Sequence, residues 1–211
     1  MTELEFVEPA KIEARSFEIL TQELPHPIDE RYAPIIKRVI HTTADFDYAD
    51  TLYFSENVLP QALDALRAGA TIVTDTQMAY SGINKPALRR HGCEARCFIS
   101  DPDVAAAAKA AGITRSAAAM DKASQLGGRL IFAIGNAPTA LIRLRELLDA
   151  RSLQPSLIIG VPVGFVNVVA SKEQIIASGA PCIVARGRKG GSSVAAAICN
   201  ALLYLLGREE S

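Results

Sequence analysis

The stretch Leu130-Ile-Phe-Ala-Ile-Gly-Asn-Ala-Pro-Thr-Ala-Leu-Ile-Arg-Leu-Arg-Glu-Leu-Leu148 contains the structural unit from which we expect the fold to be built. Its first five residues are all apolar, which is typical of a strand buried on both faces of a parallel sheet. Gly135 and Pro138 interrupt this run, and apolar residues then recur at helical spacing from Thr139. The sequence therefore predicts a strand, a short turn and a helix that returns across the sheet.

The same unit recurs on both sides of this stretch. Four more apolar runs, alternating with helical segments, predict strands at 70–75, 95–100, 156–161 and 182–186. Parallel strands joined by right-handed helical crossovers have both faces covered. We expect an α/β fold: a three-layer α/β/α sandwich around a five-stranded, mainly parallel sheet, doubly wound and flavodoxin-like. Residues 51–54 are expected to add a short edge element.

We expect residues 1–211 to form one domain, with N-terminal helices within residues 8–50 packing on the sheet domain. Apolar spacing predicts a first helix over 8–23 and a second over 29–40, separated by a proline-containing linker. In the first helix, the residues expected to face the core are Ile12, Ser16, Ile19 and Leu20 or Phe17.

Composition narrows the classes of function. The formal net charge of −1 argues against a general nucleic-acid binder. No apolar run reaches the roughly 18 residues of a membrane span, and Met1–Lys11 has no apolar signal-peptide core. We therefore expect a cytoplasmic protein that binds neither nucleic acid nor membrane.

Residues and motifs that commonly hold metals or cofactors are scarce. There are three histidines and four cysteines, and His91-x-Cys93-x3-Cys97 lacks a second Cys/His pair that would complete a metal site. In a reducing compartment the cysteines are most simply small buried groups. The chain has no Walker A loop, and no strand runs into Gly-x-Gly-x-x-Gly. We expect no metal and no separate cofactor.

The stretch Val39-Ile-His-Thr-Thr-Ala-Asp-Phe-Asp47 is the best candidate for acid–base chemistry. In it His41 follows an apolar run and precedes hydroxyl and carboxylate side chains, and imidazole changes charge near neutral pH. A hydrogen-bonded packing role is the competing interpretation. Arg38 lies three residues earlier and would share a helical face with His41. We interpret Asp45 and Asp47 as caps or orienting groups rather than as catalytic acids.

A ligand is expected outside the carboxyl ends of the strands, as in other doubly wound sheets. Thr76, Asn136 and Arg186 follow three of the predicted strands. The glycine-rich segment 187–193 opens a helix and carries basic residues, so it predicts an anion site; a structural turn with solvated charges is the alternative.

Other polar residues extend this candidate site. Thr114 is expected to cap a helix, with Arg115 in the first turn, where the helix dipole disfavours a cation and so suggests a ligand role. Lys85 and Arg15 lie outside any apolar stripe. Together these cations suit a ligand that carries several carboxylates.

These motifs resemble the precorrin-8X methylmutase and cobalt-precorrin-8 methylmutase family of corrin-ring (vitamin B12) biosynthesis. The resembling stretches occur in order along the whole chain, at 12–17, 38–47, 74–85, 112–116, 135–141, 162–165 and 187–192. The resemblance implies an isomerase that moves a methyl group from C-11 to C-12 of a tetrapyrrole corrin precursor without a separate cofactor. It also implies a homodimer with a flavodoxin-like fold, and handover of product to the next enzyme of corrin synthesis.

In the resemblance His41 corresponds to the proton donor, and Ser16 and Arg38 to substrate contacts. A methyl shift needs protonation and a pocket that fixes the ring, but no nucleophile or redox centre. With catalytic His41, the expected substrate-binding residues are Ser16, Arg38, Arg15, Thr42, Thr76, Lys85, Thr114, Arg115, Asn136 and Arg186.

The chain departs from the family pattern after Phe165, where Asn167 and Val168-Val-Ala170 replace the usual glycine, two alanines and glutamate. The His-Thr-Thr-Ala-Asp-Phe-Asp form is closer to the cobalt-containing branch, so cobalt-precorrin-8 is the favoured substrate. Two other hypotheses are a non-catalytic corrinoid carrier that uses the same pocket, and a nucleotide-binding regulator, for which the phosphate motifs are missing.

Overall fold

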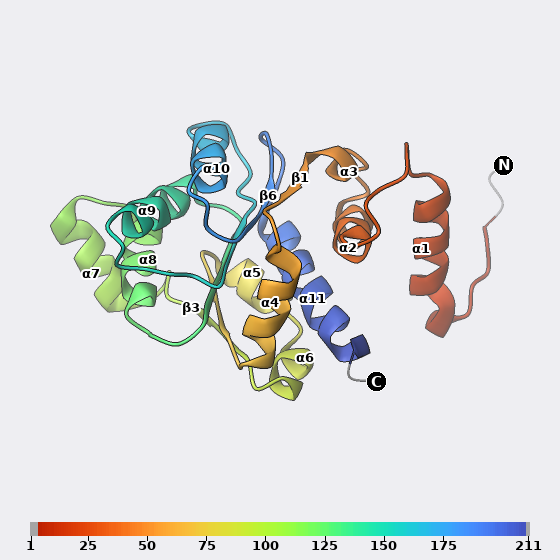
Figure 1. Ribbon diagram of the computed structural model, residues 1–211, viewed down its shortest axis with the longest axis horizontal. Coiled ribbons are helices and arrows are strands. Elements are labelled where there is room, and N and C mark those ends of the chain that lie inside the picture. Colours follow the sequence, from red (N-terminus) through yellow and green to blue (C-terminus); the bar gives the residue numbers. More distant parts are fainter. Residues whose placement is uncertain (1–3, 210–211) are drawn as a thin grey trace.

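The computed structural model describes residues 4–209 and shows a three-layer α/β/α arrangement (Figure 1). Its sheet has the strand order β1-β6-β5-β4-β2-β3, with only β1 antiparallel. The strands are β1 Leu52–Phe54, β2 Thr71–Thr74, β3 Glu94–Cys97, β4 Leu130–Ile134, β5 Leu157–Gly160 and β6 Cys182–Ala185. The five predicted parallel strands and the predicted edge element are confirmed. Strands β2 to β6 follow the flavodoxin-like order.

Helices cover both faces of the sheet. The helices within residues 4–209 are α1 Ile12–Gln22, α2 Ala33–Thr43, α3 Tyr48–Thr51, α4 Val58–Arg67, α5 Gln77–Gly82, α6 Lys85–Arg90, α7 Pro102–Ala111, α8 Arg115–Ser124, α9 Pro138–Asp149, α10 Val168–Ile176 and α11 Ser192–Glu209, after a 3-10 turn at Pro9–Lys11. Helices α4, α5, α6 and α11 share one apolar core with one face of the sheet, and α2 adds its buried side to that core. Helices α7 to α10 build the second core on the other face. None of the helices within 4–209 is both long enough and apolar enough to cross a membrane.

The alternating direction of successive strand side chains explains how the two cores form. Along β4 and β5 every residue is buried, and successive side chains enter opposite cores: Ile131 and Ala133 face α11, whereas Phe132 and Ile134 face α9. Such runs are apolar throughout because both faces are covered. Strand β3 lies at the edge, is half-exposed, and ends at Cys97 instead of continuing to residue 100 as predicted.

Helix α1 lies outside these layers and contacts α2 (Figure 1). Leu20 is its only buried residue, while Ile12 is 52% exposed and Ser16 and Ile19 are half-buried. The prediction that Ile12 faces the core is therefore wrong. Apolar spacing shows which side of a helix is apolar, but not whether another element of the same chain covers it.

Candidate active site

His41 lies in the last turn of α2, and that helix sets its position. Ile35, Ile36, Val39 and Ile40 bury one side of the helix in the core, which leaves the His41 side chain exposed. The phenyl ring of Phe17 on α1 stacks on the imidazole, with centroids 5.1 Å apart and planes 23° from parallel. An exposed imidazole with one face against an aromatic ring can reach a bound ligand and exchange protons with it.

Arg38 contacts the same phenyl ring, so it shares a face with His41 as the spacing predicts. Its guanidinium carbon lies 4.8 Å from the centroid of Phe17 and 5.2 Å from that of Tyr204. Arg38 also forms an ion pair with Glu13. Two hollows of about 260 and 640 Å³ are both lined by Phe17, Arg38 and Tyr204. The planar guanidinium of Arg38, next to two aromatic rings and a hollow, is suited to bind a carboxylate of a largely apolar ligand.

Phe17 and Tyr204 were not predicted as site residues. The sequence suggested Phe17 only as a core position of the first helix. Its neighbour Arg38 lies 21 positions later and Tyr204 lies near the carboxyl end of the chain, so the cluster forms only in three dimensions. No local pattern contains this signal.

Three other predicted residues of α1 and α2 already have partners. The hydroxyl of Ser16 donates to the carbonyl of Ile12 (2.9 Å), and that of Thr42 donates to the carbonyl of Arg38 (2.9 Å). Glu5 and Glu18 bind the guanidinium of Arg15 and raise its pKa. Each hydroxyl oxygen can still accept a hydrogen bond from a ligand.

The end of α2 is tied to the glycine-rich segment. Ala44 adopts a left-handed conformation (φ 52°) that stops the helix. Beyond it, Lys189 Nζ lies 2.7 Å from a carboxylate oxygen of Asp45 and 2.6 Å from one of Asp47. The two carboxylates raise the pKa of Lys189, and the lysine in turn lowers the pKa of Asp45. The interpretation of these aspartates as orienting groups agrees with this geometry.

Basic side chains in the segment predicted as an anion site, and Arg186 directly before it, are engaged within the protein. Arg186 lies 3.5 Å from Glu173 and over the ring of Tyr53, and Arg188 lies over the ring of Phe165. Because Lys189 is also bound by two aspartates, the geometry of this segment agrees better with a structural turn than with an anion site whose cations are unpaired.

At the carboxyl edge of the sheet, Asp75 organises the turn after β4. Its side chain is 1% exposed, and its oxygens accept hydrogen bonds from the backbone N–H groups of Gly135 (2.8 Å), Asn136 (2.8 Å) and Ala137 (2.7 Å). Burial raises the pKa of this carboxyl, against the effect of the three donors. Asp75 was not among the predicted site residues, although an acid directly after an apolar strand is a usable signal for such a role.

Thr76 and Asn136 flank this turn. The Thr76 hydroxyl caps α5 by accepting from Ala79 N (3.0 Å) and pairs with the Ser192 hydroxyl at 2.8 Å. A Cβ on Gly135 would lie 2.6 Å from the Cα of Ser192, so the start of α11 closes tightly on the end of β4. The Asn136 side chain is exposed above this closed edge and is available to a ligand.

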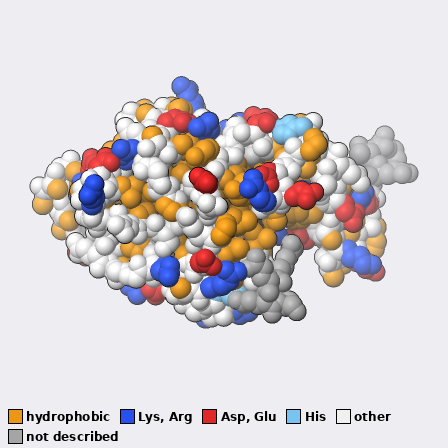
Figure 2. Space-filling model, in the orientation of Figure 1, with side chains coloured by type: hydrophobic (Ala, Val, Ile, Leu, Met, Phe, Trp, Pro, Cys, Tyr) orange, Lys and Arg blue, Asp and Glu red, His pale blue; other side chains and the backbone are white. Residues whose placement is uncertain are grey.

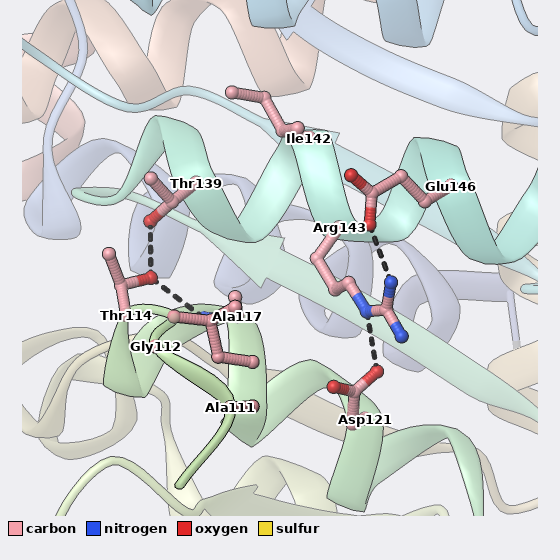
Figure 3. Close-up of a pocket in the computed structure, with 10 residues that line it drawn as sticks. Ala111, Gly112, Thr114, Ala117, Asp121, Thr139, Ile142, Arg143 and Glu146 are labelled. Carbon is pink, nitrogen blue, oxygen red and sulfur yellow. Dashed lines mark hydrogen bonds and ion pairs between the residues drawn. The ribbon is translucent and has the colours of Figure 1, made fainter. Parts of the chain in front are cut away.

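Thr114 lies elsewhere and lines a hollow of about 630 Å³ between α8 and α9 (Figure 3). Thr114 caps α8 as predicted, by accepting from Ala117 N (3.2 Å), and it donates to the Thr139 hydroxyl (2.9 Å). Across the hollow, Arg143 binds Asp121 and Glu146. Arg115 is exposed at the first turn of α8.

Lys85 closes the end of α5. Its ammonium donates to the backbone carbonyls of Tyr80 and Ile83 and lies 4.1 Å from the centroid of the Tyr80 ring. Burial lowers its pKa. In this conformation the lysine stabilises the protein backbone, and a ligand carboxylate would have to compete for it.

The predicted residues therefore form separate groups within one chain. Arg15, Ser16, Arg38, His41 and Thr42 lie on α1 and α2, and Thr76, Asn136 and Arg186 at the carboxyl edge of the sheet. Lys189 connects these two groups through Asp45 and Asp47. Helices α7 to α9 lie at the opposite end of the molecule from α1 (Figure 1), so Thr114 and Arg115 are not brought to His41 within one chain.

Comparisons with known proteins agree on one family. A family model described as precorrin-8X methylmutase matches residues 11–205. The chain is 52% identical to a cobalt-precorrin-8 methylmutase of Salmonella typhimurium over 206 residues, which cover 94% of this chain and 96% of that protein. It is 42% identical to a precorrin-8X methylmutase of Pseudomonas aeruginosa over 170 residues, 78% and 80% of the two chains. A crystal structure of precorrin-8x methyl mutase from Thermus thermophilus is similar in fold, with TM-score 0.86, 37% identity, and coverage of 95% and 100%.

Proposed function

This chain belongs to the precorrin-8X methylmutase family, an isomerase family of cobalamin biosynthesis, and we propose that His41 is its general acid. The reaction moves a methyl group from C-11 to C-12 of the corrin precursor. The observation that carries the proposal is the exposed imidazole at the end of α2, stacked on Phe17 and next to Arg38. Protonation of the ring by His41 withdraws electron density and favours the shift of the methyl group from C-11 to C-12 of the same molecule; the ring then returns the proton to the imidazole, which leaves an isomer of the substrate.

Binding of the substrate follows from its carboxylate side chains and its largely apolar macrocycle. Arg38 can pair with a carboxylate, while Phe17 and Tyr204 offer aromatic surface to the ring. Holding the macrocycle against the imidazole converts proton transfer into an intramolecular step. The carrier hypothesis gains no support, because the relatives and the crystal structure named above are all methylmutases.

Glu13 competes with the substrate for Arg38, which gives a test of the carboxylate contact. We expect Glu13→Gln to lower KM by about 1.5- to five-fold, because ion pairs of this kind are typically worth about 0.2–1 kcal/mol and this one no longer has to be broken. Steady-state kinetics at low ionic strength measures this change. Glu8→Gln, which removes the exposed pair with Lys11, is the matched control and should leave KM unchanged. An unchanged KM in Glu13→Gln contradicts the role of Arg38.

We propose cobalt-precorrin-8 as the natural substrate. The chain is 52% identical to a relative named for the cobalt form and 42% identical to one named for precorrin-8X. We expect kcat/KM to be about ten-fold or more higher for the cobalt-loaded substrate than for the metal-free one. Measuring both rates by absorbance tests this preference, and equal or reversed values contradict it.

We also propose that two chains form a homodimer in the cytoplasm and hand their product to the next enzyme of corrin synthesis. Apolar side chains near the N-terminus are exposed, with Leu4 98% and Phe6 93% accessible, and hydrophobic side chains also gather across the middle of the face drawn in Figure 2. A second chain can cover such surface and can bring its own Thr114 and Arg115 toward His41. Light scattering tests the dimer, with twice the mass of one chain expected.

A further inference from the structure

Lys189 lies 142 and 144 positions from the two aspartates that it binds, and those aspartates immediately follow the catalytic helix. Its ammonium contacts Asp45 and Asp47 at 2.7 and 2.6 Å. Asp45 uses its other carboxylate oxygen to accept from the backbone N–H of Asp47 (3.1 Å), and its own N–H donates to the Thr43 hydroxyl (3.3 Å). The side chain of Lys189 thus holds residues 45–47, which directly follow α2, in place.

The segment that carries Lys189 is itself fixed to the sheet. The fully buried Lys172 on α10 donates to the carbonyls of Gly187 (2.9 Å) and Lys189 (2.8 Å). Burial lowers the pKa of Lys172 to about 8, and an amine donates to both carbonyls in either protonation state. Gly191 N donates to the Val161 carbonyl at 2.8 Å, directly after β5. Lys189 therefore extends from a rigid base at the carboxyl edge of the sheet.

We propose that Lys189 is a positioning residue for His41. By binding Asp45 and Asp47 it fixes the end of α2 against the carboxyl edge of the sheet, and with it the place of the imidazole relative to the substrate. Packing of Ile35, Ile36, Val39 and Ile40 anchors the helix, but these residues precede His41. Helix α2 ends two residues after His41, so the position of its last turn depends on the contacts of Asp45 and Asp47 with Lys189. The inference rests on the proposed function.

The test separates kcat from KM. In Lys189→Met we expect kcat to fall on the order of ten-fold with KM within about two-fold, because a small displacement of an acid weakens the transition state more than substrate binding. Lys189→Arg should restore most of kcat, since a guanidinium can bind both carboxylates. Thermal unfolding is measured in parallel to show that each variant is folded.

The matched control is Lys122→Met. Lys122 also binds two aspartates, Asp101 and Asp103, each at 2.7 Å, but it joins α8 to the start of α7, away from His41. Its kcat should equal that of the wild type. Wild-type kcat in Lys189→Met, an equal loss in Lys122→Met, or no recovery in Lys189→Arg overturns the proposal. If Lys189→Met is unfolded, Asp47→Asn at an exposed carboxylate must lower kcat instead, and wild-type kcat there overturns it.

The same series separates this inference from the proposed function. If His41→Ala retains wild-type turnover, the acid role itself fails. If His41→Ala is inactive while Lys189→Met is fully active, only the positioning role fails.

Discussion

Replacing Asp75 with asparagine lowers the melting temperature by about 6–12 °C, which corresponds to about 3 kcal/mol for a domain of this size. Both carboxylate oxygens are in use: one accepts from Gly135 N, and the other accepts from Asn136 N and Ala137 N. An asparagine has only one acceptor oxygen, so its amide N–H₂ must face at least one buried donor. That donor is left without a partner in a site that excludes water.

The expected loss extends to activity, because the turn held by Asp75 carries Asn136 at the carboxyl edge. Circular dichroism during heating measures the stability of the variant. The matched control is Asp64→Asn, which removes an exposed carboxylate beside Arg67 on α4 and should change stability by no more than about 1 kcal/mol. Equal melting temperatures for the two variants contradict the role given to Asp75.

Replacing His41 with alanine lowers kcat by a factor of about 10²–10⁴, the usual contribution of a general acid. The imidazole is exposed and stacks on the ring of Phe17. Stability should therefore change by no more than about 1.5 kcal/mol, and KM should change little because Arg38 and the aromatic rings are untouched. Single-turnover absorbance measures the rate of the chemical step.

His26→Ala is the control for that experiment. His26 is also an exposed histidine and binds Asp50 through Nε2 at 2.8 Å, but it lies in the linker between α1 and α2. Its kcat should match that of the wild type. If His41→Ala and His26→Ala have the same kcat as the wild type, then another group supplies the proton.

The layers of the fold were predictable because apolar runs and breakers are local signals. The fully apolar run 130–134 predicted β4 within a residue, and residues 51–54 predicted the edge strand β1. Thr114 was predicted as a cap because the capping bond spans three residues. Ile12 was assigned wrongly because, among residues 4–209, no element buries its side chain, which is 52% exposed.

The site was predictable only in part. His41 and Arg38 share a helix, so their common face followed from spacing, whereas Phe17 between them comes from another helix. The contacts of Asp75 with the turn after β4, and of Lys189 with Asp45, join residues 60 or more positions apart. Because charged side chains in one sequence do not specify their partners, both an anion site and a structural turn were possible for segment 187–193 from the sequence alone.

Turnover of excess cobalt-precorrin-8 tests whether this chain isomerises a corrin precursor. The purified protein is incubated with many equivalents of substrate, and the absorbance spectrum and mass of the tetrapyrrole are followed together. We expect the spectrum of many equivalents to change while their mass stays the same, because the methyl group moves within one molecule. An unchanged spectrum, or one equivalent of unaltered substrate retained per site, would contradict it.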